Sequence, residues 1–98
     1  MSRLEGKTAV ITGGTRGLGY AIAQAYAAEG AAVVVASRSA ESVDAAVDAL
    51  RAGGAQAAGT PADVGERAQV EALADFAVDT FGGFDVWVNN AGLSPAYG

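Results

Sequence analysis

The sequence predicts an α/β fold with a parallel sheet, and two observations support this. Four short runs of apolar and β-branched residues alternate with three amphipathic segments of helical length. The apolar runs show no in-out alternation, as in the three consecutive valines at 33–35, which is typical of parallel strands covered on both faces. This order indicates β-α-β units with right-handed crossovers, so we expect an incomplete doubly wound parallel sheet of four strands and three helices.

The first half of the chain has clear start and stop signals. A strand is expected over residues 7–12, followed by a helix over residues 16–29. Gly30 is placed to supply a left-handed cap at the end of that helix. The second strand is expected over residues 32–36, so it follows the cap almost at once.

The second half repeats the pattern. Ser39 is a candidate N-cap for a helix that reaches residue 52. The third strand, over residues 56–60, has the weakest pattern, because Ala and Gly are poor strand formers and Pro61 is expected to break it. A helix over residues 66–80, closed by two glycines, leads to a fourth strand over residues 85–89.

Composition narrows the class of function. The formal net charge is −5, and the six Lys and Arg residues are spread along the chain, so we expect no nucleic-acid partner and no anionic membrane partner. Cysteine and histidine are both absent, which excludes disulfides and thiolate metal sites, and we expect no metal centre. No run approaches the roughly 18 apolar residues of a membrane helix, and no leader pattern precedes the first strand. A cytoplasmic protein is expected.

A glycine-rich turn at residues 12–19 joins the first strand to the first helix. In such a turn Gly13 allows the tight bend, Gly17 a close approach of a ligand, and Gly19 the packing of helix on strand. The first turn of the helix adds unpaired N–H groups and a positive dipole end, which suit the pyrophosphate of a dinucleotide. The candidate cofactor-binding residues of this turn are Gly13, Gly14, Thr15, Arg16, Gly17, Leu18 and Gly19.

The GxxxGxG spacing of Gly13, Gly17 and Gly19 resembles the short-chain dehydrogenase/reductase family rather than the commoner GxGxxG fingerprint. Three further stretches agree with that family: Ala-Ser-Arg at 36–38, Asp-Val at 63–64 and Asn-Asn-Ala-Gly at 89–92. Each follows one of the later strands. The resemblance implies that residues 1–98 are the N-terminal part of a single NAD(P)-binding Rossmann domain, with strand order 3-2-1-4.

The end of the second strand bears on the choice of cofactor. An Asp or Glu usually stands there when the cofactor has a free ribose 2′-hydroxyl, but this chain has Ser37 and Arg38. Arg38 and Arg16 could each pair with a 2′-phosphate, so we expect NADP(H) in preference to NAD(H). The alternative for Arg38 is a solvated surface side chain.

For the two remaining stretches, the resemblance implies further cofactor contacts. Asp63 and Val64 resemble the pair that contacts adenine, although an Asp after a strand is also a common turn or helix-capping residue. For Asn90, Ala91 and Gly92 the resemblance implies both stabilisation of the sheet and contact with the cofactor ribose. A buried amide at a strand end needs hydrogen-bond partners in either case.

The chemistry implied by the resemblance is hydride transfer between a nicotinamide and a carbonyl or alcohol, as in 3-oxoacyl reductases, with a Ser and a Tyr-x-x-x-Lys motif. Lys7 is the single lysine here and lies ahead of the first strand, so no such motif exists in the chain. We assign no catalytic residue and expect the chain by itself to be inactive. Its full-length parent would act on a small alcohol or ketone as a homo-oligomer.

Two alternatives remain open. The chain could be a non-catalytic dinucleotide-binding module or sensor, although Val86, Trp87 and Val88 would then lie exposed at an unpaired sheet edge. Alternatively, epimerases, dehydratases and enoyl reductases use related cofactor halves, often with different glycine spacing.

Overall fold

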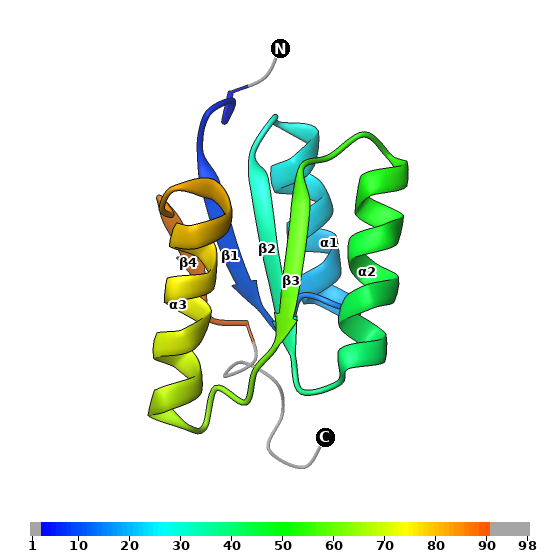
Figure 1. The fold of residues 1–98 in the computed structure, drawn as a ribbon. Coiled ribbons are helices and arrows are strands. Elements are labelled where there is room, and N and C mark those ends of the chain that lie inside the picture. The colour runs from blue at the N-terminus through cyan, green and yellow to red at the C-terminus, as the bar shows by residue number, and fades with distance from the viewer. Residues whose placement is uncertain (1–2, 91–98) are drawn as a thin grey trace.

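The computed structural model describes residues 3–90, which form a four-stranded sheet flanked by three helices (Figure 1). In chain order the elements are β1 (Thr8–Thr12), α1 (Gly17–Ala28), β2 (Ala32–Ser37), α2 (Ala40–Ala52), β3 (Ala57–Pro61), α3 (Arg67–Phe81) and β4 (Val86–Val88). The strands lie in the order β3-β2-β1-β4 and every pairing is parallel. The predicted fold class, strand order and element sequence are therefore confirmed.

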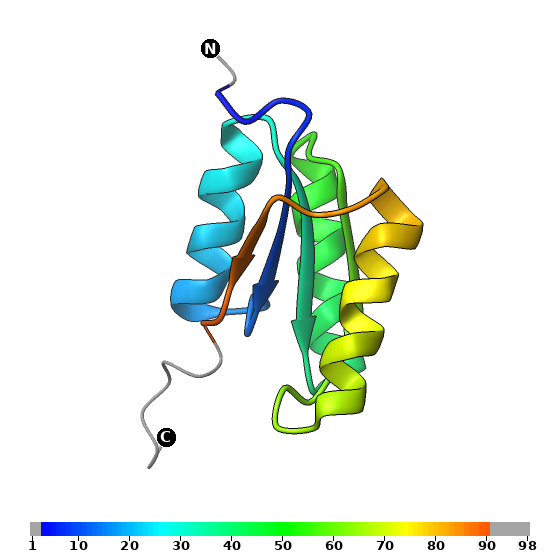
Figure 2. The same ribbon diagram turned by 90° about the vertical axis from the view of Figure 1, so that its left-hand side faces the viewer.

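The parallel pairing brings all four strand ends to one edge of the sheet. β1 lies between β2 and β4, with Ile11 opposite Val35 on one side and Val88 on the other. In Figure 1 the arrowheads of β1 and β3 point toward the same lower edge, and in Figure 2 those of β1, β2 and β4 do so. The connections that follow the strands, where the candidate site residues lie, thus meet at that edge.

The sheet is covered on both faces, but unequally. α1 and α2 lie on one face and α3 on the other, as the rotated view shows (Figure 2). On the first face Ile11, Val33 and Val35 pack among buried residues of both helices. On the second face Val10 and Val34 pack against α3. Because successive strand side chains point to opposite faces, the central strands bury both sets, which explains their unbroken apolar runs.

Glycines end the helices as the sequence predicted. Gly30, after α1, has φ of 94°, and the Ala31 N–H donates to the Tyr26 carbonyl oxygen at 3.1 Å. The same arrangement follows α2, where Gly54 has φ of 95°. Such Schellman motifs satisfy the last carbonyls of a helix and need a residue that tolerates positive φ. The predicted cap at Ser39 is also confirmed, since its Oγ accepts a hydrogen bond from the Ser42 N–H at 3.2 Å.

Two details differ from the expectation. β3 continues through Pro61 instead of ending before it, because β3 is an edge strand and a proline there removes no ladder donor that the sheet needs. The β4 side chains are half-buried rather than exposed. Trp87 packs against the core on the α3 side, and its ring centroid lies 5.3 Å from that of Phe84 in an edge-to-face arrangement.

Candidate functional site

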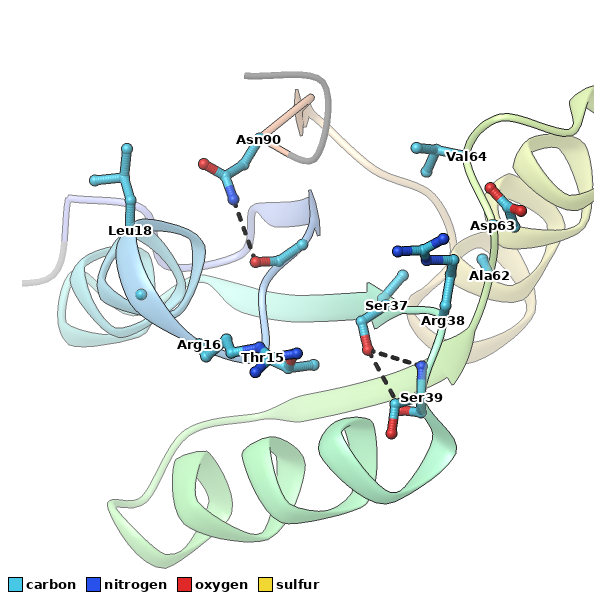
Figure 3. Close-up of a pocket in the computed structure, with 13 residues that line it drawn as sticks. Thr15, Arg16, Leu18, Ser37, Arg38, Ser39, Ala62, Asp63, Val64 and Asn90 are labelled. Carbon is cyan, nitrogen blue, oxygen red and sulfur yellow. Dashed lines mark hydrogen bonds between the residues drawn. The ribbon is translucent and has the colours of Figure 1, made fainter. Parts of the chain in front are cut away.

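A cavity of about 820 Å³ opens at the carboxyl edge of the sheet. Its walls come from the segments that follow all four strands (Figure 3). The lining residues are Gly13, Thr15, Arg16, Gly17, Leu18, Ala36, Ser37, Arg38, Ser39, Ala62, Asp63, Val64 and Asn90. Its volume falls within the usual range for pockets that bind small molecules. The structure thus brings most of the predicted site residues around one space.

The glycine turn is held close to β2. The N–H groups of Gly13 and Gly14 both donate to the Ala36 carbonyl oxygen, at 2.8 and 3.3 Å. Gly13 and Gly17 have φ of 64° and 59°, in the left-handed region that favours glycine. A β-carbon at Gly17 would meet no atom within 4 Å, so space beside this residue is open to a ligand.

Gly14 and Gly19 were predicted as site residues, but neither lines the cavity, and both are buried behind the turn. A β-carbon at Gly19 would overlap the Gly13 carbonyl oxygen and lie 2.6 Å from Asn90 Nδ2. One at Gly14 would lie 2.9 Å from Val35 Cγ1. Gly19 was expected to allow the helix to pack on the strand. In the structure the atoms that crowd it belong to the glycine turn and to Asn90.

The N-terminus of α1 is open toward the cavity. Arg16 is the N-cap residue in extended conformation, its side chain makes no capping hydrogen bond, and the first turn of α1 contains no acidic residue. Gly17 and Leu18 of that turn line the cavity, and Leu18 is 65% exposed. The positive end of the helix and its N–H groups are therefore available to an anion.

The segment after β2 presents a cation and a small hydroxyl. Ser37 Oγ donates to the Ser39 carbonyl oxygen and accepts from the Ser39 N–H, both at 3.3 Å, which holds the start of α2 against the strand end. Arg38 is exposed, its guanidinium lies on the cavity side (Figure 3), and it forms no ion pair with any residue in 3–90. Asp63, which follows β3, is the single acidic residue in the lining.

Asp63 lies in a turn, which was the alternative to adenine contact that the sequence analysis left open. Its Oδ1 accepts from the Gly65 N–H at 2.9 Å, forming an Asx turn, while the N-cap of α3 is Glu66. The Asp63 N–H donates to Gln69 Oε1 at 2.7 Å. Asp63 still lines the cavity next to Val64, so the turn and a ligand contact are compatible.

Asn90 joins the end of β4 to the glycine turn. The residue is 8% exposed, and its Nδ2 donates to the Gly13 carbonyl oxygen at 3.2 Å (Figure 3). Thr12 Oγ1 donates to the Val88 carbonyl oxygen at 3.3 Å, close to the same junction. The buried amide thus has the partner that its position requires. Ala91 and Gly92, the other two residues predicted for this segment, lie outside the described residues.

Three lining residues were not predicted as cofactor-binding residues: Ala36, Ser39 and Ala62. Each lies next to a predicted strand end or helix start, which is the signal that could have found them. Two have small apolar side chains, so no pattern of chemistry marked them.

Two negative findings concern residues 3–90 alone. Within this range no cluster of acidic residues has the arrangement needed to hold a metal ion. None of the three helices described there is long and apolar enough to cross a membrane.

A parallel sheet with a glycine turn and an open helix N-terminus at its carboxyl edge defines a Rossmann-type nucleotide-binding protein. The family model for short chain dehydrogenases matches residues 7–97, and this chain belongs to that family.

Similar proteins agree with this assignment. An uncharacterized oxidoreductase of Methylorubrum extorquens is 49% identical over 94 residues, covering 95% of this chain and 38% of the relative. A short-chain dehydrogenase/reductase from Burkholderia phymatum, solved in complex with NAD, has a TM-score of 0.83 and 41% identity, over 89% of this chain and 31% of that one. Actinorhodin polyketide ketoreductase, solved with NADPH, has a TM-score of 0.85 and 36% identity, over 92% of this chain and 34% of that one. The chain thus spans well under half the length of these proteins.

Proposed function

We propose that this chain is the N-terminal, cofactor-binding part of an NADP(H)-dependent oxidoreductase that acts on a carbonyl or alcohol substrate. The observation that carries the proposal is the pair of arginines, Arg16 and Arg38, in the lining of a cavity that has no carboxylate at the end of β2. Membership of the short-chain dehydrogenase family supports the oxidoreductase class. Relatives of known structure bind NAD in one case and NADPH in another, so the choice between them depends on this chain's own residues.

The cavity suits a dinucleotide in size and in charge. The pyrophosphate would lie on the glycine turn, against the N–H groups at the start of α1. Asp63 and Val64 would contact the adenine, while Asn90, with Ala91 and Gly92, would lie beside a ribose. When bound, the cofactor would supply a hydride to a carbonyl or accept one from an alcohol, and the residues of this chain would hold that cofactor.

Selection of NADP(H) would come from charge at the ribose 2′ position. A charge-assisted hydrogen bond from Arg38 to a 2′-phosphate contributes about 1.5–3 kcal/mol, which corresponds to a preference of about tenfold or more. Ser37, at the carboxyl end of β2, has a neutral hydroxyl where a carboxylate would repel the phosphate. Arg16 approaches the same cavity from the start of α1.

The Arg38→Asp variant tests this assignment. The variant replaces the proposed phosphate partner with a carboxylate, so the ratio of the NADH to the NADPH dissociation constants should fall by about tenfold or more. Fluorescence titration with both cofactors measures that ratio. Arg3→Asp carries the same charge change at an exposed position before β1 and should leave the ratio unaltered. An unaltered ratio in Arg38→Asp would contradict NADP(H) selection.

The proposed reaction needs residues that this chain does not contain. Lys7 is its single lysine and lies at the opposite end of β1 from the cavity, so the Ser and Tyr-x-x-x-Lys motif of the proposed enzyme would follow Gly98. Sequencing the native reading frame past the Gly98 codon tests this directly: a continuation with that motif supports the oxidoreductase, and a stop codon favours a non-catalytic nucleotide-binding module. We also propose that the complete enzyme is a cytoplasmic homo-oligomer. Its substrate would be a small ketone or alcohol, as for a 3-oxoacyl reductase.

A further inference from the structure

Gln69, in the first turn of α3, contacts the backbone of Asp63, a predicted cofactor-binding residue. Its Oε1 accepts a hydrogen bond from the Asp63 N–H at 2.7 Å, and its Nε2 donates to Glu66 Oε2 at 3.0 Å. Gln69 is half-buried and does not line the cavity. It therefore touches the cavity wall from behind, through the backbone of Asp63.

The segment between β3 and α3 is held at successive points. The Ala62 N–H donates to the Ser37 carbonyl oxygen at 2.8 Å, which continues the pairing of β3 with β2. Gln69 holds the next N–H, that of Asp63, and Asp63 Oδ1 holds the Gly65 N–H at 2.9 Å. These bonds orient the peptide between Asp63 and Val64 relative to the cavity.

Two hydrogen-bonding groups of this segment remain available to a ligand. Within residues 3–90, Asp63 Oδ2 accepts no hydrogen bond and the Val64 N–H donates none. An acceptor and a donor on adjacent residues match the edge of adenine, which presents an amino donor next to a ring-nitrogen acceptor. Hypoxanthine presents the reverse pattern, a carbonyl oxygen next to an N–H, and would leave both protein groups unpaired or opposed.

We propose that Gln69 is a positioning residue that sets the orientation of Asp63 and Val64 and thereby the preference of the site for adenine. This inference rests on the proposed function. Glu66 contributes by fixing the amide of Gln69: only the NH₂ group can donate to the Glu66 carboxylate, which turns the amide oxygen toward the Asp63 N–H. Without that oxygen the Asp63 N–H loses its partner. The Asp63 carboxylate and the Val64 N–H, which would face the base, then shift relative to each other.

The experiment compares NADPH with its hypoxanthine analogue in the natural protein that contains this chain. We expect the wild type to bind NADPH about tenfold or more tightly than the analogue, because the analogue leaves two groups unpaired. In Gln69→Leu, which keeps the side-chain size and removes its polar atoms, the preference should fall below about threefold. Gln24→Leu makes the same chemical change on an exposed position of α1 and should keep the wild-type ratio.

A second variant separates positioning from a general loss of stability. The double variant Glu66→Gln with Gln69→Glu exchanges the two side chains and leaves the net charge unchanged. The carboxylate at position 69 can still accept from the Asp63 N–H, and the amide at position 66 can donate to that carboxylate. This double variant should recover the adenine preference. If Gln69→Leu does not fold, Gln69→Asn shortens the amide's reach by one methylene and takes its place, with the same fall expected.

The outcomes are distinguishable. A Gln69 variant that retains the wild-type ratio, an exchange variant that fails to recover it, or a wild type with no adenine preference overturns the positioning role and leaves cofactor binding intact. A wild type that binds neither dinucleotide contradicts the proposed function instead.

Discussion

At the scale of single residues, the glycines of the turn differ in what they require. Gly17 needs its positive φ but has open space around it, whereas Gly19 is crowded by the Gly13 carbonyl and the Asn90 amide. The glycine spacing predicted different roles for the two, a close ligand approach at Gly17 and close packing at Gly19. The difference arises because Asn90, far along the chain, donates to the same carbonyl that α1 approaches.

Gly19→Ala should therefore disturb both stability and binding. The added methyl must displace the turn or Asn90, and we expect a loss of about 1–3 kcal/mol in the free energy of unfolding together with weaker NADPH binding. Gly53→Ala is the matched control, because a β-carbon there would lie 3.5 Å from the Leu50 carbonyl oxygen, an ordinary contact, and φ is −83°. Denaturant unfolding and cofactor titration, in the natural protein that contains this chain, check both variants. Equal stability losses would contradict the crowding argument.

At the scale of elements, β4 depends on a contact just before the strand begins. The Asp85 N–H donates to the Thr8 carbonyl oxygen at 2.8 Å, and Asp85 Oδ2 accepts from the Thr8 N–H at 2.9 Å. Thr8 is only 6% exposed, so its N–H has little access to water. This reciprocal pair aligns β4 with β1, and β4 in turn positions Asn90 at the cavity.

Asp85→Ala should leave the Thr8 N–H buried without a partner, at a cost of about 1–3 kcal/mol in the free energy of unfolding. Asp85→Asn keeps an acceptor oxygen and should lose less than half as much. Thermal unfolding of the two variants measures the difference. If Asp85→Asn is as destabilising as Asp85→Ala, the hydrogen bond is not the source of the loss.

The elements also show how far local patterns predict structure. Helix ends at Gly30 and Ser39 follow from the conformational freedom of glycine and the acceptor of serine, and both predictions are confirmed. The end of β3 was predicted one residue short. Pro61 is tolerated because β3 lies at the sheet edge, and strand order is a property of the whole sheet.

At the scale of the whole molecule, large apolar side chains remain exposed around α3 and β4. Val78 of α3 and Phe84, just before β4, are 48% and 41% exposed, and β4 is an edge strand. Exposed apolar surface beside an unpaired edge favours association between molecules.

We therefore expect the 98-residue chain, produced alone, to aggregate or self-associate and to show no hydride transfer with NADPH and ketones. Size-exclusion chromatography, thermal unfolding and the absorbance of NADPH check this. A soluble monomer that melts cooperatively would favour the nucleotide-binding module over the cofactor half of an enzyme.

The amino-acid sequence was sufficient to predict the α/β class, the strand order and most residues around the cavity. The α/β class and the glycine turn follow from periodicity, glycines and capping residues, which are local features, whereas the strand order and the later site stretches came from the family resemblance. The positions of Gly14 and Gly19 behind the cavity, the lining by Ala36, Ser39 and Ala62, and the bond from Asn90 to Gly13 could be seen in the folded chain alone. The physical reason is that these outcomes depend on which distant segments the parallel pairing of strands brings into contact.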